Sequence, residues 1–89
     1  MAEKLAFELV SPERQLLSDQ VEVVQVPGAE GDFAVMPGHA PVMSTIRPGV
    51  VEVTGGTDGD KRFFIYGGFA EVTPAGLTLL AEEAIPMEE

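Results

Sequence analysis

The chain opens with a period-two pattern of apolar residues, which is the period of a half-buried β-strand. In LAFEL, residues 5–9, every second residue is large and apolar, and the residues between are Ala6 and Glu8. One face of this segment is therefore apolar and the other is not. Pro12 ends the pattern, because proline cannot donate a hydrogen bond to a strand ladder. The sequence predicts a first strand over residues 5–9.

Short apolar stretches recur along the rest of the chain and are separated by turn-forming residues. The 10 glycines and 7 prolines fall at short intervals between them, which is typical of an all-β domain. The loop TGGTDGD, residues 54–60, predicts a hairpin, and residues 73–76 (TPAG) predict a tight turn. The further stretches predicted as strands lie at residues 16–26, 33–36, 42–46, 50–53, 62–66, 69–72 and 77–80.

Two positions break the simple alternation and leave local alternatives open. Between Val23 and Val24 the apolar phase slips by one residue, which indicates either a bulge or a strand with both faces covered. Gly67-Gly68 interrupts the run that follows residues 62–66, at either a bulge or a tight corner. Neither break changes the fold class.

About eight to ten short strands fit into a chain of 89 residues. A single open sheet of such strands would leave its apolar face in water. The sequence therefore predicts one small all-β domain, either a β-sandwich or a flattened barrel, with no internal repeat or linker.

More apolar residues are present than a half-buried strand needs. Residues 63–66 read Phe-Phe-Ile-Tyr, and Leu79-Leu80 is a second doublet, so apolar side chains point to both faces. The surplus either lies on an outer face, where a sizeable apolar patch usually marks a partner site, or returns to the core through bulges and strand crossings. The pattern alone favours neither alternative.

The last residues suggest a change of structure. After Leu80 the sequence turns acidic and loses its alternation, and Pro86-Met87-Glu88-Glu89 resembles the opening of a helix. Proline is common at the first helical position, and carboxylates are favourable in the first turn. We therefore expect a β-sandwich domain over residues 1–84, and over residues 85–89 the start of a helical domain that has been either removed or naturally lost.

Charge and composition restrict the partners. Fifteen acidic against five basic residues give a formal charge of −10, which repels nucleic acid and anionic lipid and favours a basic partner. The same charge could serve only to keep a small domain soluble. The chain has no cysteine, no secretory signal pattern at its start, and no apolar run near the ~20 residues that cross a bilayer.

Candidate chemistry is sparse. His39 is the only histidine, so a zinc site lacks further nitrogen or sulfur ligands. A metal at His39 with Glu30 or Asp32 is a weaker interpretation than a loop histidine bound to backbone or to a partner. The serines have no second histidine or evident orienting acid, and the paired glycines do not have phosphate-loop spacing. We expect no enzyme activity, no metal and no cofactor.

Two long blocks resemble the epsilon subunit of F-type ATP synthases. The first is VEVVQVPGAEGDFAVMPGHAPVMSTIRPGVVEV, residues 21–53, in which EGDFAVMPGHAP at residues 30–41 is the most specific part. The second is FIYGGFAEVTPAGLTLLAEEA, residues 64–84. Together they cover most of the chain in the family's order and spacing.

The resemblance implies a ten-stranded β-sandwich followed by a two-helix hairpin. It implies a non-catalytic rotor part, peripheral at the cytoplasmic face of the bacterial inner membrane, which joins the gamma stalk to the ring of membrane-embedded c subunits. By resemblance, the c-ring contacts are Glu30, Gly31, Asp32 and His39. By resemblance, the gamma contacts are Ser11, Phe64 and Tyr66.

The chain departs from the family pattern in two ways. Ala34 stands where family members commonly have glycine, and the helical hairpin is absent from the sequence. The inhibitory and ATP-binding roles that depend on the hairpin are therefore not expected here. Two other interpretations stay open: a free-standing β-sandwich module for a small ligand or carbohydrate, and a hydrolase that uses scattered carboxylates.

Overall fold

The computed structural model describes residues 4–57 and 59–87, which form ten β-strands. The strands are β1 (Leu5–Val10), β2 (Gln15–Val21), β3 (Val23–Gly28), β4 (Gly31–Val35), β5 (Val42–Ile46), β6 (Gly49–Gly56), β7 (Gly59–Ile65), β8 (Gly68–Thr73), β9 (Gly76–Ala81) and β10 (Ala84–Met87). Within the described residues there is no helix that could cross a membrane.

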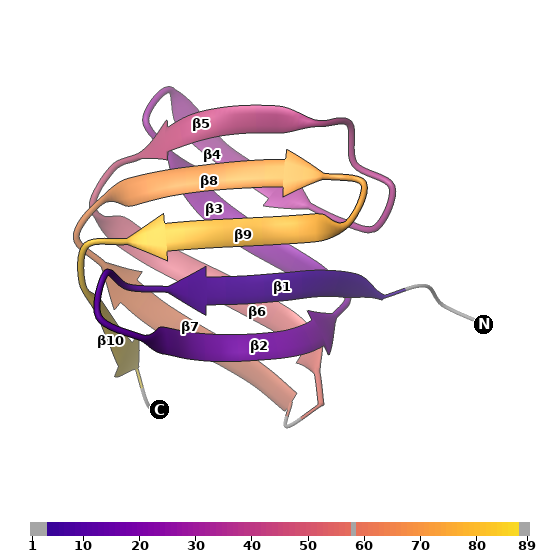
Figure 1. The fold of residues 1–89 in the computed structure, drawn as a ribbon, viewed down its shortest axis with the longest axis horizontal. Helices are drawn as coiled ribbons and strands as arrows, with labels where there is room; N and C mark the ends of the chain where they lie inside the picture. Colours follow the sequence, from indigo (N-terminus) through magenta and orange to yellow (C-terminus); the bar gives the residue numbers. More distant parts are fainter. Residues whose placement is uncertain (1–3, 58, 88–89) are drawn as a thin grey trace.

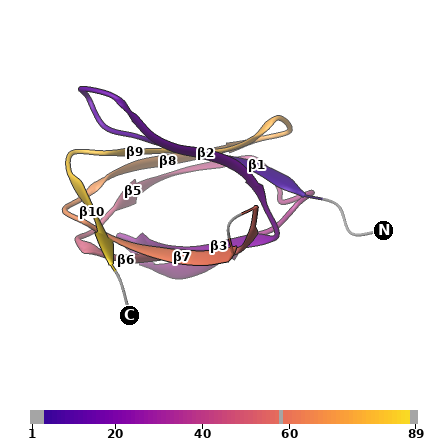
Figure 2. The same ribbon diagram turned by 90° about the horizontal axis from the view of Figure 1, so that it is seen from below.

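The strands form two layers that face one another (Figures 1 and 2). The front sheet, nearer the viewer in Figure 1, has the order β2-β1-β9-β8-β5, and the back sheet has the order β10-β7-β6-β3-β4. A single pairing, Gly28 with Ile46, joins the sheets along one side. All pairings are antiparallel except that of β1 with β9. The expected all-β sandwich is confirmed.

The core lies between the two sheets and is apolar. No described polar or charged residue is buried, so burial of hydrocarbon is the main stabilising term. The buried residues are Leu5, Phe7, Leu9, Val21, Val24, Val26, Val35, Ile46, Val51, Val53, Phe63, Ile65, Ala70, Val72, Leu77, Leu79 and Ala81. The odd-numbered apolar residues of β1 belong to this set, as the alternation predicted.

The two irregular positions are both places where the chain changes sheet. β2 ends at Val21, a bend at Glu22 follows, and β3 begins in the other sheet at Val23. Val24 is buried and Val23 only half-buried, so the slip of apolar phase reflects this crossing and not a bulge within one strand. Gly67 is a tight corner between β7 and β8, where the Glu82 amide donates to the Gly67 carbonyl over 3.1 Å.

The C-terminal segment differs from the expected helix opening. Residues 84–87 form β10, which pairs antiparallel with β7, Pro86 opposite Phe63. A proline is tolerated there because β10 is an edge strand and one side of it needs no donor. The sheet therefore extends past residue 84 to Met87, and the prediction of a helix beginning at Pro86 is wrong for residues 86–87. Glu88 and Glu89 lie outside the described residues.

Candidate docking surfaces

The strand ends form two loop clusters at opposite ends of the sandwich. The β3–β4 end, at the left in Figure 1, also carries the β1–β2 turn and the β9–β10 connection. The β4–β5 end, at the right, carries the loop 36–41 and the β8–β9 turn. Residues on different clusters cannot share one small contact, because β4 and β5 separate them by roughly 15 Å, at ~3.3 Å per residue.

Three of the four residues expected to contact the c-ring lie together at the β3–β4 end. Glu30, Gly31 and Asp32 follow one another in the β3–β4 turn and at the start of β4, and all three are exposed. Gly31 has φ +144°, a conformation that strongly favours glycine. An added Cβ at this position would meet no atom within 4 Å, so backbone conformation and not space accounts for the glycine.

The β3–β4 turn is tied to the corner between β5 and β6. The Ala29 amide donates to the Thr45 carbonyl over 2.9 Å, and the Arg47 amide donates to the Pro27 carbonyl over 3.0 Å. The Arg47 guanidinium also pairs with the Asp32 carboxylate. The exposed turn is therefore held by both backbone and side-chain contacts.

His39 lies at the β4–β5 end, away from the three residues above. It is half-buried in the loop 36–41, and its backbone amide donates to the Met36 carbonyl over 3.1 Å. Its Nδ1 lies 2.7 Å from the Ala40 carbonyl oxygen. The loop borders a cleft of about 180 Å³ that it shares with the β8–β9 turn and the start of β1. Within the described residues, no group of three or more His, Cys, Asp or Glu side chains could hold a metal ion.

The surplus apolar residues lie partly on the outer face of the back sheet. Phe64 is half-buried and Tyr66 is 48% exposed, and their rings meet edge to face with centroids 5.1 Å apart. Phe64 stands between Val50 of β6 and Ile85 of β10 in the strand register. These four residues form the back row, an outward apolar strip beside the β3–β4 end.

A second outward strip crosses the front sheet. Phe69 of β8 pairs with Leu80 of β9, and Leu80 pairs with Val10 of β1. Met43 of β5 pairs with Glu71 of β8, two residues along that strand from Phe69, and is 60% exposed. We call these four residues the front row; the Leu79-Leu80 doublet signalled part of it, but no sequence signal singled out Met43 or Phe69.

Ser11, the remaining expected gamma contact, caps the β1–β2 turn. Its hydroxyl accepts from the Arg14 amide over 3.3 Å, and its own amide donates to the Arg14 carbonyl over 2.8 Å. Ser11 and Glu83 border the same cleft, and the Tyr66 amide donates to the Glu83 carbonyl over 3.1 Å. Ser11 and Tyr66 therefore lie on two sides of the β9–β10 connection.

One carboxylate closes the open side of the sandwich. Asp19 of β2 accepts from the Thr57 hydroxyl over 2.6 Å and from the Thr57 amide over 2.8 Å. These hydrogen bonds, the hydroxyl first, hold the pKa of Asp19 below its usual value, since they favour the charged carboxylate. They link β2 to the β6–β7 turn, where no strand pairing among the described residues joins β2 to β6 or β7.

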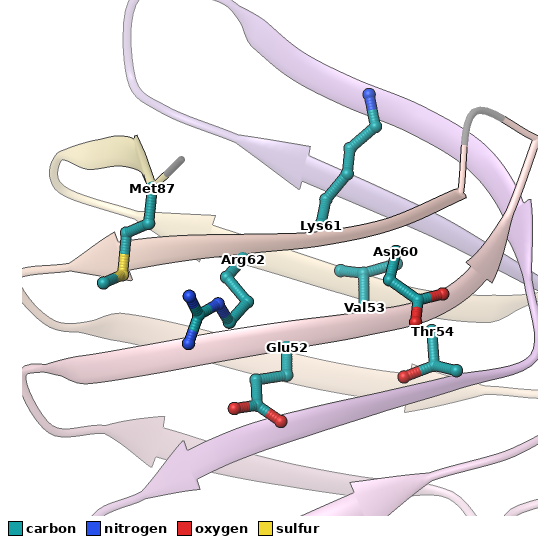
Figure 3. A pocket seen from close by; sticks show the side chains of 7 residues that line it. All are labelled: Glu52, Val53, Thr54, Asp60, Lys61, Arg62 and Met87. Atoms are coloured by element: carbon teal, nitrogen blue, oxygen red, sulfur yellow. The ribbon is translucent and has the colours of Figure 1, made fainter. Parts of the chain in front are cut away.

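The outer face of the back sheet also carries a shallow pocket of about 340 Å³ (Figure 3). Three of the lining side chains project from the same face of the sheet, namely Glu52, Arg62 and Met87. The Lys61 side chain points to the opposite side of β7. Its walls are mainly long charged or polar side chains, and none of the lining residues is aromatic. A sugar site would need aromatic platforms, so this pocket does not favour a carbohydrate ligand.

Comparison with known families gives one match that covers nearly the whole chain. Residues 4–87 match the family described as ATP synthase, Delta/Epsilon chain, beta-sandwich domain. The chain is 61% identical over 89 residues to the ATP synthase epsilon chain of Parvibaculum lavamentivorans and 57% identical to that of Mesorhizobium japonicum. It is fully covered in both and spans 67% and 66% of the two relatives, about two thirds of their length.

Solved structures give the same fold. A chain in the cryo-EM structure of the Euglena gracilis mitochondrial ATP synthase, OSCP/F1/c-ring, matches with a TM-score of 0.87 and 27% identity, over 100% of this chain and 57% of that one. A chain in the Tetrahymena thermophila mitochondrial ATP synthase central stalk and c-ring matches with a TM-score of 0.79 over 94% of this chain and 67% of that one. Its identity is 14%, so it supports the fold alone.

Proposed function

The chain belongs to the ATP synthase delta/epsilon β-sandwich family, and on that premise we propose that it is a docking part of the rotor. It joins the gamma subunit to the c-ring and has no catalytic role of its own. The observation that carries this proposal is the family match over residues 4–87 together with 61% identity to a bacterial epsilon chain. The proposal therefore places the chain peripherally, at the cytoplasmic face of the bacterial inner membrane.

We propose the β3–β4 turn as the c-ring contact. Glu30, Gly31 and Asp32 are exposed on a turn that is tied down at its base, so docking would order few new residues. Carboxylates at such a rim orient a partner with basic or amide groups more than they add affinity. His39 lies at the other end of the sandwich, so its proposed contact belongs to a separate surface.

The gamma contact is proposed on the back row beside the same end. Phe64, Tyr66 and Ile85 present apolar surface that can supply burial, with Tyr66 48% and Ile85 43% exposed. Tyrosine is common in such interfaces because it combines a large apolar ring with a polar tip. Ser11, across the β9–β10 connection, lies at the margin of this proposed contact and supplies a polar rim.

Co-purification tests the proposal. The chain, carrying an affinity tag, is expressed with the gamma subunit of its own ATP synthase, and the proposal expects a stoichiometric complex that survives gel filtration. Tyr66→Ser should weaken that complex, and Thr78→Ser, an exposed change on the front sheet, is the matched control. The absence of any complex between the wild-type chain and gamma would refute the docking function.

A further inference from the structure

We propose that the charge of Asp19 keeps the free edge of β2 from pairing with a second copy of the chain. The end of β6 holds the Asp19 carboxylate on the side of β2 that an added strand would cover. The inference concerns the β-sandwich itself and does not rest on the proposed function, because it needs neither gamma nor the c-ring.

The free edge of β2 is the longest one in the described part of the chain. β2 ends the path of paired strands and pairs only with β1. It has 7 residues, whereas β4, β5 and β10, the strands at the other sheet edges, have 5, 5 and 4. β10 also contains Pro86, which has no amide to donate to an added strand, while β2 contains no proline. A long free edge is a template for pairing with another chain, so β2 needs protection of another kind.

Asp19 occupies a position of β2 that the alternation assigns to the inner face. It pairs with the buried Phe7, and the next positions on the same face are Leu17 and Val21, which both pack in the core. Asp19 itself is only half-buried, so its carboxylate still meets water. Removing water from an ionised carboxylate costs free energy, and a strand added at this edge would cover Asp19. An inward charge on an edge strand therefore opposes the addition of a further strand.

The end of β6 holds this carboxylate in place. The Thr57 hydroxyl donates to it at 2.6 Å and the Thr57 amide at 2.8 Å. An ideal Cβ on Gly56 would lie 2.8 Å from Asp19 Oδ2, so a side chain at that position would push the carboxylate away. These contacts keep the charge at the inner side of the edge and prevent the side chain from turning out into solvent.

A second contact fixes the same stretch of β6. Lys4 Nζ donates to the Gly55 carbonyl at 2.8 Å and lies 3.7 Å from the Glu22 carboxylate. Gly55 has φ +79°, and an added Cβ would overlap the Glu22 side chain. The Gly55-Gly56 pair thus leaves bare backbone for two acidic side chains, which gives this glycine pair a role in the fold.

A second copy of the chain is the partner that this edge favours. Strand addition uses main-chain hydrogen bonds, so a free edge can pair with the same edge of another copy in antiparallel orientation. Asp19 is the only charged residue of β2, which reads QLLSDQV. Without that charge the strand is neutral and retains Leu16 and Leu17, and neutral apolar segments are those that pair with their own copies.

Sedimentation equilibrium at several protein concentrations tests the proposal. Asp19→Val removes the charge and introduces a residue that suits a strand. We expect this variant to self-associate at least about ten-fold more tightly than wild type. Ser18→Val is the matched control, because it adds the same residue to the exposed outer face of the same strand and leaves Asp19 in place. The control should self-associate no more than wild type.

Hydrogen exchange then locates the contact between the copies. In Asp19→Val, amides of β2 should exchange at least about three-fold more slowly when the chain is associated than when it is dilute. The amides of β10, at the edge of the other sheet, should exchange at the same rate in both states. Slowed exchange confined to strands other than β2 would overturn the proposal.

Asp19→Asn keeps the test decisive if the valine variant does not fold. Asparagine removes the charge but retains an oxygen that can accept from Thr57, and this variant should also self-associate more tightly than wild type. The inference is wrong if every folded variant without the Asp19 charge self-associates no more than wild type. It is also wrong if Ser18→Val associates as tightly as Asp19→Val, since apolar surface and not the lost charge would then be the cause.

Discussion

Gly76 is a position where a single added methyl group should damage the fold, and the chain offers a matched control for it. It begins β9, which pairs in parallel with β1, and has φ +143°. An added Cβ would lie 2.9 Å from the Ala6 Cβ and closer still to the Ala6 carbonyl oxygen. Real Cβ atoms essentially never come under 3.0 Å, so β1 and β9 would have to separate.

The chain contains a matched control for the backbone part of this effect. Gly31 has φ +144°, nearly the same value, but an added Cβ there meets nothing within 4 Å. Gly31→Ala should therefore cost only the strain of the unfavourable φ, about 1–3 kcal/mol of the free energy of unfolding. Gly76→Ala should cost that amount plus about 1–3 kcal/mol for forcing two packed strands apart.

Thermal and urea unfolding of the two variants measure the difference. With ~4–8 °C of Tm per kcal/mol for a domain of this size, Gly76→Ala should melt at least about 4–8 °C below Gly31→Ala. The urea midpoints should fall in the same order. Equal unfolding midpoints for the two variants would refute the reasoning, since the close approach of Ala6 would then carry no cost.

Three further predictions concern stability, pH and coupling. Leu79→Ala should lower the free energy of unfolding by about 2–5 kcal/mol, because Leu79 is fully buried, while Leu80→Ala should lower it by less than about 1 kcal/mol, because that side chain is 47% exposed. Urea unfolding measures both, and equal losses would contradict the assignment of Leu79 to the inner face and Leu80 to the outer face. Because the folded pKa of Asp19 is lowered, its hydrogen bonds to the β6–β7 turn stabilise the fold at neutral pH, and this contribution is lost as the pH falls below about 4. Asp19→Asn should thus be less stable than wild type at pH 7 and should approach it at pH 3, and an unchanged gap between these pH values would exclude the carboxylate as the cause. Replacing Asp32 and His39 together by alanine should weaken the coupling of ATP hydrolysis to proton pumping and leave the far-ultraviolet circular dichroism unchanged, and normal coupling in an assembled enzyme would exclude both as contacts.

The residues of the candidate site could be proposed from the sequence, but their arrangement could not. Glu30, Asp32 and His39 all fall within the motif at residues 30–41, which gives no sign that they lie at opposite ends of a strand. The partner of Asp32 could not be predicted either. Arg47 is fifteen residues away, and only the pairing of Gly28 with Ile46 brings the two segments together.

The C-terminus shows how tertiary context overrides a local signal. Proline followed by carboxylates favours a helix start, yet Ile85 and Pro86 pair with Phe64 and Phe63 of β7. The free edge of β7 offers hydrogen bonds and an apolar strip to any neighbouring segment. Four residues that add one strand to an existing sheet need no helix nucleus, which is the costly step for a short helix.

The sequence by itself determined the all-β class, the strands and their turns, because alternation and the spacing of Gly and Pro are local properties. It also identified the family. The tertiary structure alone decided which face of each strand is buried where the apolar phase slips, since Val23 and Val24 lie at a crossing between sheets. It also decided which apolar residues form the front and back rows, because exposure depends on neighbouring strands that are far apart in the chain.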